Sequence, residues 1–149
     1  MVTDKVVLVI DDDRAVLETM RILLEGKGGF HVHCAVGSTG ASHFLSTQER
    51  VDVLIADVLL AGETTGIDVC HLARLRHPGI GLVVISADPS TDERHLPDRS
   101  VYLRKPFGGT ALVEAIKRAQ AFVTLDLAAK LSPDIDRESV PGPDSTLLR

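Results

Sequence analysis

The chain has few aromatic residues and few cysteines. Phe, Tyr and Trp together make up 3% of its 149 residues, and Trp is absent. Few side chains are therefore available for stacking on bases or sugars. The two cysteines, Cys34 and Cys70, are too few for the disulfide framework of a small secreted domain, so they fit a reducing compartment. We expect both to be buried small apolar groups rather than reactive thiols.

A long apolar run and an excess of basic residues are also missing. No segment approaches the roughly 18 apolar residues of a membrane-spanning helix. The N-terminal MVTDKVV does not have the order of a signal peptide. The 16 basic and 21 acidic residues give a net charge of −5, which argues against binding nucleic acid through its phosphates. We expect a cytoplasmic protein with neither membrane insertion nor direct nucleic-acid binding.

Short runs of Val, Ile and Leu recur along the chain, and each ends at a polar residue. They are Val6 to Ile10, Val53 to Ala56, Leu82 to Ile85, and Val101 to Leu103. Runs that are apolar on both faces are typical of central strands in a parallel sheet that is covered on both sides. The segment from Phe30 to Ala35 alternates polar and apolar residues instead, which predicts an edge strand with His31 and His33 exposed.

Segments with helical periodicity lie between these runs. The apolar positions that mark them are Leu17, Met20 and Leu24; Ala41, Phe44 and Leu45; Ile67, Cys70 and Leu75; and Leu112, Ile116 and Ala119. We expect the first helix to be capped by Asp13 and to stop at Gly26 and the Gly28–Gly29 pair, whereas Ser38 and Thr110 should cap the second and the last. Alternating strands and helices predict an α/β doubly wound fold with helices on both faces of the sheet.

Two stretches lack this regular pattern. The connection from Ser86 to Ser100 is polar and has room for only about two helical turns, so we expect a stunted fourth helix. After Val123 the apolar period is lost. We therefore predict one domain over residues 4–122 and a C-terminal extension over 123–149, which is helical at first and then flexible.

Charged side chains stand where the predicted strands end, and the carboxyl ends of parallel strands share one edge of a sheet. The first strand ends at Asp11-Asp12-Asp13, the third at Asp57, the fourth at Ser86 and the fifth at Lys105. Two carboxylates about 4 Å apart repel by roughly 4 kcal/mol at an effective dielectric constant near 20, so the aspartates need protons or a cation. Ligands that are all oxygen suit Mg²⁺. A cation, an ammonium and a hydroxyl together suit a phosphoryl group, and Asp57 can act as its nucleophile.

Four strings carry a family resemblance. VLVIDDD, DVLIAD, VVISA and VYLRKPF, in this order and spacing, resemble the receiver domain of two-component response regulators, of the chemotaxis-receiver type. The resemblance covers residues 4–122 and implies a flavodoxin-like sheet of five parallel strands in the order 2-1-3-4-5. Because the remaining residues are too few for a helix-turn-helix module, a stand-alone receiver is expected. A fragment of a larger transcription factor or hybrid kinase is the alternative.

The resemblance also implies a role for each site residue. Asp57 would accept a phosphoryl group from a histidine kinase or a histidine phosphotransfer protein. The implied ligands of Mg²⁺, or of Mn²⁺, are Asp12, Asp57 and the main-chain carbonyl of Leu59, with Asp11 acting through water; Ser86 and Lys105 would contact the phosphoryl oxygens; Ser86 and Tyr102 would form the switch; and the Lys105–Pro106 peptide bond would be cis. The implied output is a downstream protein partner or a homodimer at the face near Tyr102. No turnover of an external substrate is implied, so an enzyme is not expected.

One departure from the family and two alternatives remain open at this point. The loop DVLLAGETTG is longer than the common pattern and has Ala61 where a proline is usual. A phosphatase of the haloacid dehalogenase type would use similar groups, but its Asp-x-Asp-x-Thr/Val pattern is not met, because Ala15 follows Asp11 and Asp13. The other alternative is a pseudo-receiver that binds partners without being phosphorylated.

Overall fold

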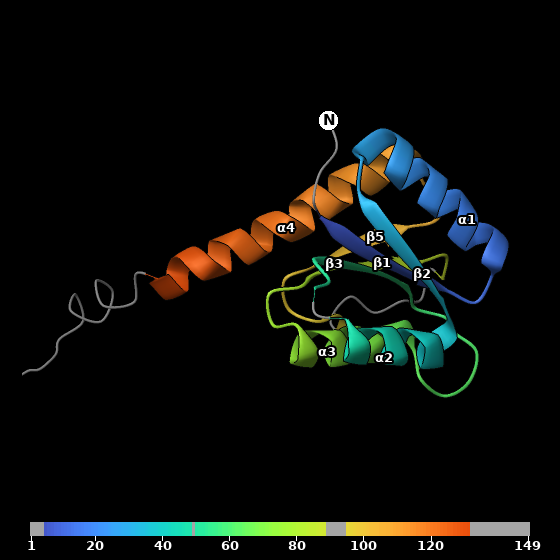
Figure 1. The fold of residues 1–149 in the computed structure, drawn as a ribbon, viewed down its shortest axis with the longest axis horizontal. Coiled ribbons are helices and arrows are strands. Elements are labelled where there is room, and N and C mark those ends of the chain that lie inside the picture. Colours follow the sequence, from blue (N-terminus) through green and yellow to red (C-terminus); the bar gives the residue numbers. More distant parts are fainter. Residues whose placement is uncertain (1–4, 49, 89–94, 132–149) are drawn as a thin grey trace, which may run out of the picture.

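The protein folds around one parallel β-sheet (Figure 1). The computed structural model describes residues 5–48, 50–88 and 95–131. Its strands are β1 (Val6–Asp11), β2 (His31–Val36), β3 (Val53–Asp57), β4 (Gly81–Ser86) and β5 (Ser100–Arg104). They lie in the order β2-β1-β3-β4-β5, and every neighbouring pair is parallel. The predicted strand order is confirmed.

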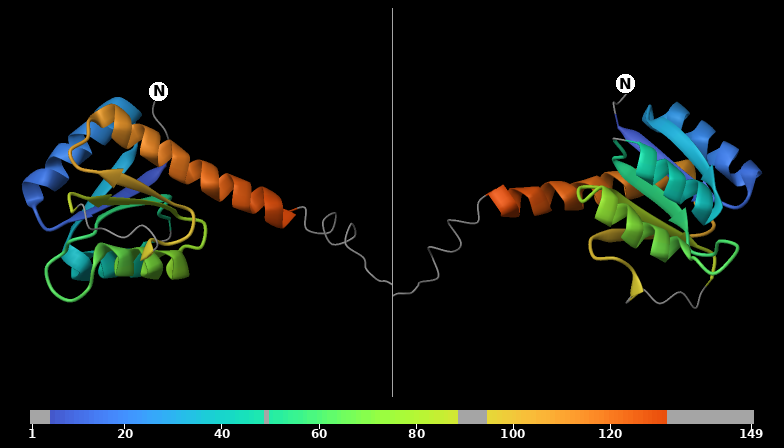
Figure 2. Two further views of the ribbon diagram at one scale, coloured as in Figure 1. Left: turned by 180° about the vertical axis from the view of Figure 1, so that it is seen from behind. Right: turned by 60° about the horizontal axis from the view of Figure 1, so that its bottom comes forward.

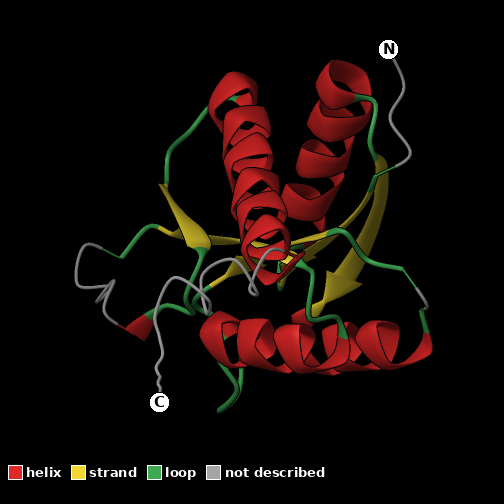
Figure 3. Ribbon diagram, turned by 90° about the vertical axis from the view of Figure 1, so that its left-hand side faces the viewer, coloured by secondary structure: helices red, strands yellow, loops and turns green. Residues whose placement is uncertain are grey.

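Helices cover both faces of the sheet, as Figure 3 shows most clearly. They are α1 (Arg14–Leu23), the π-helical turn η1 (Leu24–Gly28), α2 (Gly37–Thr47), α3 (Gly66–Arg76) and α4 (Gly109–Leu131). Helices α1 and α4 lie on one face, and α2 and α3 lie on the other. This arrangement confirms the doubly wound α/β fold.

The sheet divides the core into two layers. Val7 and Val9 of β1 pack on the side of α1 and α4, whereas Leu8 and Ile10 pack on the side of α2 and α3. Successive side chains of a strand point to opposite faces, so a central strand must be apolar at every position to fill both layers. Each such side chain contributes about 1.5–3 kcal/mol when it is fully buried. The continuous apolar runs in the sequence are therefore explained by burial on both faces.

Strand register brings the polar strand ends to one edge of the sheet. Ile10 pairs with Ala56, so Asp11 and Asp57 follow directly after paired residues. Asp57 in turn pairs with Ile85, which precedes Ser86. The short apolar runs thus set the positions of the polar groups that follow them.

The helix starts agree only partly with the sequence. Asp13 caps α1 by accepting a hydrogen bond from the backbone N–H of Ala15, as predicted. The predictions for Ser38 and Thr110 are wrong, because α2 begins at Gly37 without a side-chain cap and α4 begins at Gly109. Gly37 has a φ of 72°, which lets the chain turn from β2 into α2 one residue before Ser38.

Burial corrects two other expectations. Cys70 is fully buried in α3, but Cys34 is exposed, because it lies on the edge strand β2. Leu75 is 80% exposed, since α3 buries Val69, Cys70 and Ala73 instead. His31 and His33 are exposed on β2, as predicted.

The end of the first helical segment and the C-terminal segment can both be compared with the sequence predictions. The first helical segment runs through Gly26, so no stop occurs there. It ends at Gly28, and Gly29 takes a left-handed φ of 65°, which confirms the predicted stop at the Gly28–Gly29 pair. Helix α4 runs without a break across residues 122 and 123 to Leu131 and extends beyond the sheet (Figure 2). The predicted flexible tail from residue 132 onwards lies outside the described residues.

The connection between β4 and β5 is described only in part. Residues 89–94, where most of the predicted short helix would fall, lie outside the described residues, and the flanking residues 87–88 and 95–99 form no α-helix. Among the helices that the structure describes, none combines the length and apolar character needed to cross a membrane.

Candidate functional site

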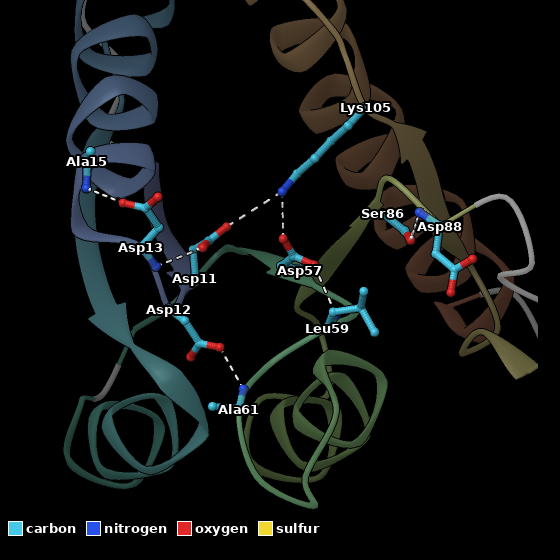
Figure 4. Close-up of polar contacts among 10 residues, drawn as sticks. All are labelled: Asp11, Asp12, Asp13, Ala15, Asp57, Leu59, Ala61, Ser86, Asp88 and Lys105. Carbon is cyan, nitrogen blue, oxygen red and sulfur yellow. Dashed lines mark hydrogen bonds and ion pairs between the residues drawn. The ribbon is translucent and has the colours of Figure 1, made fainter.

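Two carboxylates and one ammonium meet at the carboxyl edge of the sheet. Lys105, directly after β5, places its Nζ 2.6 Å from Oδ2 of Asp57 and 3.8 Å from Oδ2 of Asp11 (Figure 4). These three residues come from distant parts of the chain, namely the ends of β1 and β3 and the position directly after β5. The structure therefore brings together three of the residues that the sequence predicted for the site.

The surroundings raise the pKa values of both Asp11 and Lys105. Burial raises the pKa of Asp11, and the nearby charge of Asp57 raises it further, against the lowering effects of a hydrogen bond from the Asp13 amide and of Lys105. Partial burial lowers the pKa of Lys105, but the hydrogen bond and charge of Asp57 outweigh this effect, so the pKa lies above its ordinary value. Lys105 is thus held as a cation beside two acids.

Asp12 and Asp13 point away from this group. The carboxylate of Asp13 caps α1. Oδ2 of Asp12 accepts a hydrogen bond of 2.6 Å from the backbone N–H of Ala61, in the loop between β3 and α3 (Figure 4). Of the three consecutive aspartates, only Asp11 is close to Lys105.

Ser86 and Leu59 flank Asp57 on the other side. Ser86, the last residue of β4, is fully buried, and its Oγ accepts a hydrogen bond of 2.9 Å from the backbone N–H of Asp88. The backbone N–H of Leu59 donates to Oδ1 of Asp57 at 2.9 Å, while the Leu59 side chain is 63% exposed. In Figure 4 Asp57 lies between Asp11 and Ser86, in agreement with the order of β1, β3 and β4.

The other predicted site features lie on or near β5. The Lys105–Pro106 peptide bond is cis. Tyr102 is partly buried and packs against the core layer on the side of α2 and α3. It therefore lies two residues before the end of the strand that carries Lys105 into the site.

An open cavity of about 420 Å³ borders the charged group. Its walls are mostly apolar and come from α1, the strand ends and the segment after β5; they include Met20, Leu23 and Phe107 as well as Asp11, Asp57 and Lys105. The carboxylate of Asp57 therefore remains accessible from the side of α1.

The donor groups suit a hard cation such as Mg²⁺, although they are not gathered around one point. Carboxylates and backbone carbonyls are the oxygen ligands that Mg²⁺ prefers. Burial, together with the nearby charge of Asp57, keeps the pKa of Asp11 raised even with Lys105 present, and a bound cation would favour the ionised carboxylate. Within the described ranges, however, no three acidic, histidine or cysteine side chains form a ready metal-binding group. The donor chemistry fits the cation, and Asp12 would have to turn away from Ala61 to join it.

Sequence reasoning missed two contacts of the loop that follows Asp57. One is the hydrogen bond between Ala61 and Asp12; the only signal for it was the absence of proline at position 61, which leaves an N–H available. The other is at Gly66, where a Cβ atom would overlap the backbone carbonyl oxygen of Asp57. The first contact joins residues that are distant in sequence and the second depends on how the loop after Asp57 folds back, so spacing could not reveal either of them.

Comparison with known proteins assigns most of the chain to one family. Residues 7–117 match the family model described as the response regulator receiver domain. The chain belongs to this family: it contains a receiver domain of two-component response regulators.

The relatives are bacterial response regulators. Response regulator MprA of Mycobacterium avium is 33% identical over 137 residues, covering 90% of this chain and 55% of that protein. The probable transcriptional regulatory protein TcrX of Mycobacterium tuberculosis is 28% identical, covering 84% of this chain and 55% of that protein. The chain thus spans about half the length of these relatives.

Solved structures share the fold. A response regulator receiver protein from Sinorhizobium medicae superposes with a TM-score of 0.72 at 24% identity, covering 79% of this chain and 95% of that one. A CheY-like receiver domain protein from Methanospirillum hungatei gives a TM-score of 0.71 at 22% identity, covering 83% and 99%. These two likenesses support the receiver fold.

Proposed function

We propose that Asp57 accepts a phosphoryl group from a phosphohistidine donor, either a histidine kinase or a histidine phosphotransfer protein. The observation that carries this proposal is the position of Asp57, 2.6 Å from the ammonium of Lys105 and beside Asp11, at the carboxyl edge of the sheet. Asp57 supplies the nucleophilic carboxylate oxygen. A bond forms from this oxygen to phosphorus while the phosphorus–nitrogen bond to the donor imidazole breaks, and the imidazole keeps the bonding electron pair.

Lys105 and Ser86 are the groups that we assign to the phosphoryl oxygens. Phosphoryl transfer spreads negative charge over these oxygens, and fixed cations and hydrogen-bond donors stabilise it. The raised pKa of Lys105 keeps it protonated at neutral pH. Ser86, buried at the end of β4, offers a hydroxyl donor on the side of Asp57 opposite Asp11.

Mg²⁺, with Mn²⁺ as a substitute, is the cofactor that we assign to this site. Asp12, Asp57 and the main-chain carbonyl of Leu59 would hold it directly, with Asp11 acting through water. When bound, such a cation neutralises part of the charge on the acids and on the incoming phosphoryl group. Asp12 would have to leave the Ala61 amide in order to hold the cation.

The output that we propose is a change in protein binding at the face near Tyr102. The Ser86 hydroxyl would move toward the phosphoryl group on Asp57. Tyr102, on the neighbouring strand β5, would respond by changing its packing. The partner is a downstream protein or a second copy of the chain, with no direct contact to nucleic acid by this domain. We place this domain in the cytoplasm. We also propose that it turns over no external substrate and is therefore not an enzyme.

Two other functions are less well supported. A haloacid dehalogenase-type phosphatase would need its nucleophile at the end of the first strand with a second aspartate beside it, whereas Asp13 serves as the cap of α1. The comparisons lend that phosphatase no support. A receiver without phosphorylation would not need an ammonium beside Asp57, which the structure has.

The test is incubation with Mg²⁺ and acetyl phosphate, followed by intact mass and peptide mapping. We expect one phosphoryl group per chain on Asp57, with no labelling in Asp57→Asn. Asp98→Asn, an exposed aspartate in the loop before β5, is the matched control and should label as the wild type does. Steady hydrolysis of a phosphomonoester, or equal labelling of Asp57→Asn, would contradict the proposal.

A further inference from the structure

The carboxylate of Asp12 is a bridge between two loops. It follows β1, and its Oδ2 accepts the N–H of Ala61 at 2.6 Å, 49 residues further along the chain. Its other oxygen, Oδ1, lies against Gly37, where a Cβ atom would stand 3.4 Å away. Figure 4 shows this side chain directed to Ala61, away from Asp57 and Lys105. Asp12 therefore binds the loop before α3 and lies close to the start of α2, rather than joining the charged group.

The residue at position 61 makes this contact possible. Only a residue with a backbone N–H can donate the hydrogen bond, and proline has none. Hydrogen bonds to a carboxylate are stronger than those between neutral groups. Both residues are exposed, however, so water competes for the same groups and the net contribution of this bond is modest.

We propose that the Ala61 amide is a positioning group that holds Asp12 away from the cation site, so that Mg²⁺ binds only by exchanging this hydrogen bond for a metal–carboxylate contact. This inference rests on the proposed function, because it takes Asp12 to be a ligand of the cation. Its consequence is that cation binding releases Ala61, in the loop between β3 and α3, from Asp12. Occupancy of the site is thereby communicated to the loop that leads into α3.

The exchange lowers the affinity for the cation. A site whose competent arrangement is only partly populated binds more weakly in proportion to that population. Removing the competing hydrogen bond should therefore tighten Mg²⁺ binding by about three- to tenfold, where tenfold corresponds to about 1.4 kcal/mol.

Calorimetric titration of Mg²⁺ into the wild type, Ala61→Pro and Ala61→Gly provides the first test. Ala61→Pro removes the N–H and should bind Mg²⁺ more tightly. Ala61→Gly keeps the N–H and should bind like the wild type, even though it also changes the side chain and loosens the loop. Equal or weaker binding by Ala61→Pro would overturn the inference, and so would equal tightening by Ala61→Gly.

Nuclear magnetic resonance of the wild type provides a second test that does not depend on the proline variant folding. The backbone amide resonance of Ala61 should move upfield in the proton dimension as Mg²⁺ is added, because its hydrogen bond is lost. The midpoint of this shift should coincide with the midpoint of Mg²⁺ binding. An Ala61 resonance that stays in place at saturation would refute the exchange. If the wild type binds Mg²⁺ and is phosphorylated, but the Ala61 resonance does not move and Ala61→Pro does not bind more tightly, this inference alone fails. If the wild type binds no Mg²⁺ and takes up no phosphoryl group, the proposed function fails and the inference with it.

Discussion

The ammonium of Lys105 lies 2.6 Å from Oδ2 of Asp57, although 48 positions separate the two residues in the chain. Lys105 follows β5 and Asp57 ends β3, with β4 between them in the sheet. The long lysine side chain spans the intervening strand at the carboxyl edge. The reactive oxygen that we propose for Asp57 is therefore paired in advance with the cation that would receive the phosphoryl charge.

Removing this ammonium should slow phosphorylation. Lys105→Met keeps much of the side-chain length but loses the charge, and we expect the rate with acetyl phosphate to fall by about 100-fold, the loss typical of one missing transition-state donor. Lys117→Met is the control, because Lys117 is exposed on α4 and pairs only weakly with Glu114 at 3.9 Å. Quench-flow or gel-based phosphorylation kinetics measure both variants, and similar rates for the two would contradict the assignment of Lys105.

Neutralising Asp11 should stabilise the fold. Its pKa is raised above the ordinary value of 3.8, so ionisation costs the folded state more than the unfolded chain. The favourable contribution of Asp11 is full below pH 3.8 and is lost as the pH rises through its folded pKa. Without divalent cations, Asp11→Asn should raise the free energy of unfolding at pH 7 by about 0.5–1 kcal/mol, a figure that allows for solvent screening.

Urea unfolding at pH 7 and pH 4.5 measures this effect. The gain from Asp11→Asn should be smaller at pH 4.5, where the wild-type carboxyl is closer to its protonated form. Asp98→Asn, an exposed site, should change little at either pH. A lower free energy of unfolding for Asp11→Asn at pH 7 would contradict this prediction, because it would mean that the ionised carboxylate stabilises the fold.

Gly66 should not tolerate a side chain. A Cβ atom there would overlap the carbonyl oxygen of Asp57, which is backbone and cannot move aside without shifting the site. We expect Gly66→Ala to lower the free energy of unfolding by about 2–4 kcal/mol. Gly26→Ala is the control, since nothing lies within 4 Å of its Cβ position, and it should be neutral or slightly stabilising. Thermal unfolding compares the two; equal melting temperatures would mean that the loop adjusts easily.

The two cysteines should differ in reactivity. Burial raises the pKa of Cys70 to about 12, and its side chain is inaccessible. Cys34 is exposed on β2, although partial burial of its thiol raises the pKa there as well. A thiol reagent should therefore modify one thiol per native chain, slowly, and two after denaturation. Peptide mapping identifies the site, and rapid native labelling of Cys70 would show that α3 opens from the sheet.

Leu59 should protect the phosphorylated state. Its amide donates to Asp57 (Figure 4), and its exposed apolar side chain, two residues after the proposed phosphoacceptor, would exclude attacking water. Leu59→Asn should lose the phosphoryl group severalfold faster, followed as decay of the phosphorylated mass. Leu75→Asn, also at an exposed leucine but on α3, is the control. A rate for Leu59→Asn at or below that of the wild type would rule out this role.

The sequence alone was enough to place most of the charged site. Strands that are apolar on both faces are typical of a parallel sheet covered on both sides, and parallel strands end at a common edge. The sequence therefore predicted that the polar residues after the apolar runs, Asp11, Asp57, Ser86 and Lys105, lie at one edge of the sheet. The structure places Lys105 close to both Asp57 and Asp11 there. Asp13 was predictable as a cap because capping is a local interaction.

Tertiary structure decided the features that depend on distant neighbours. The exposure of Cys34 follows from the edge position of β2, and the exposure of Leu75 from which side of α3 meets the sheet. Asp12 has the same residue type and nearly the same position as Asp11, yet one carboxylate lies beside Lys105 and the other on the Ala61 amide. Periodicity specifies the face on which a residue lies, but the partner of a side chain is selected only when loops far apart in the chain are packed together.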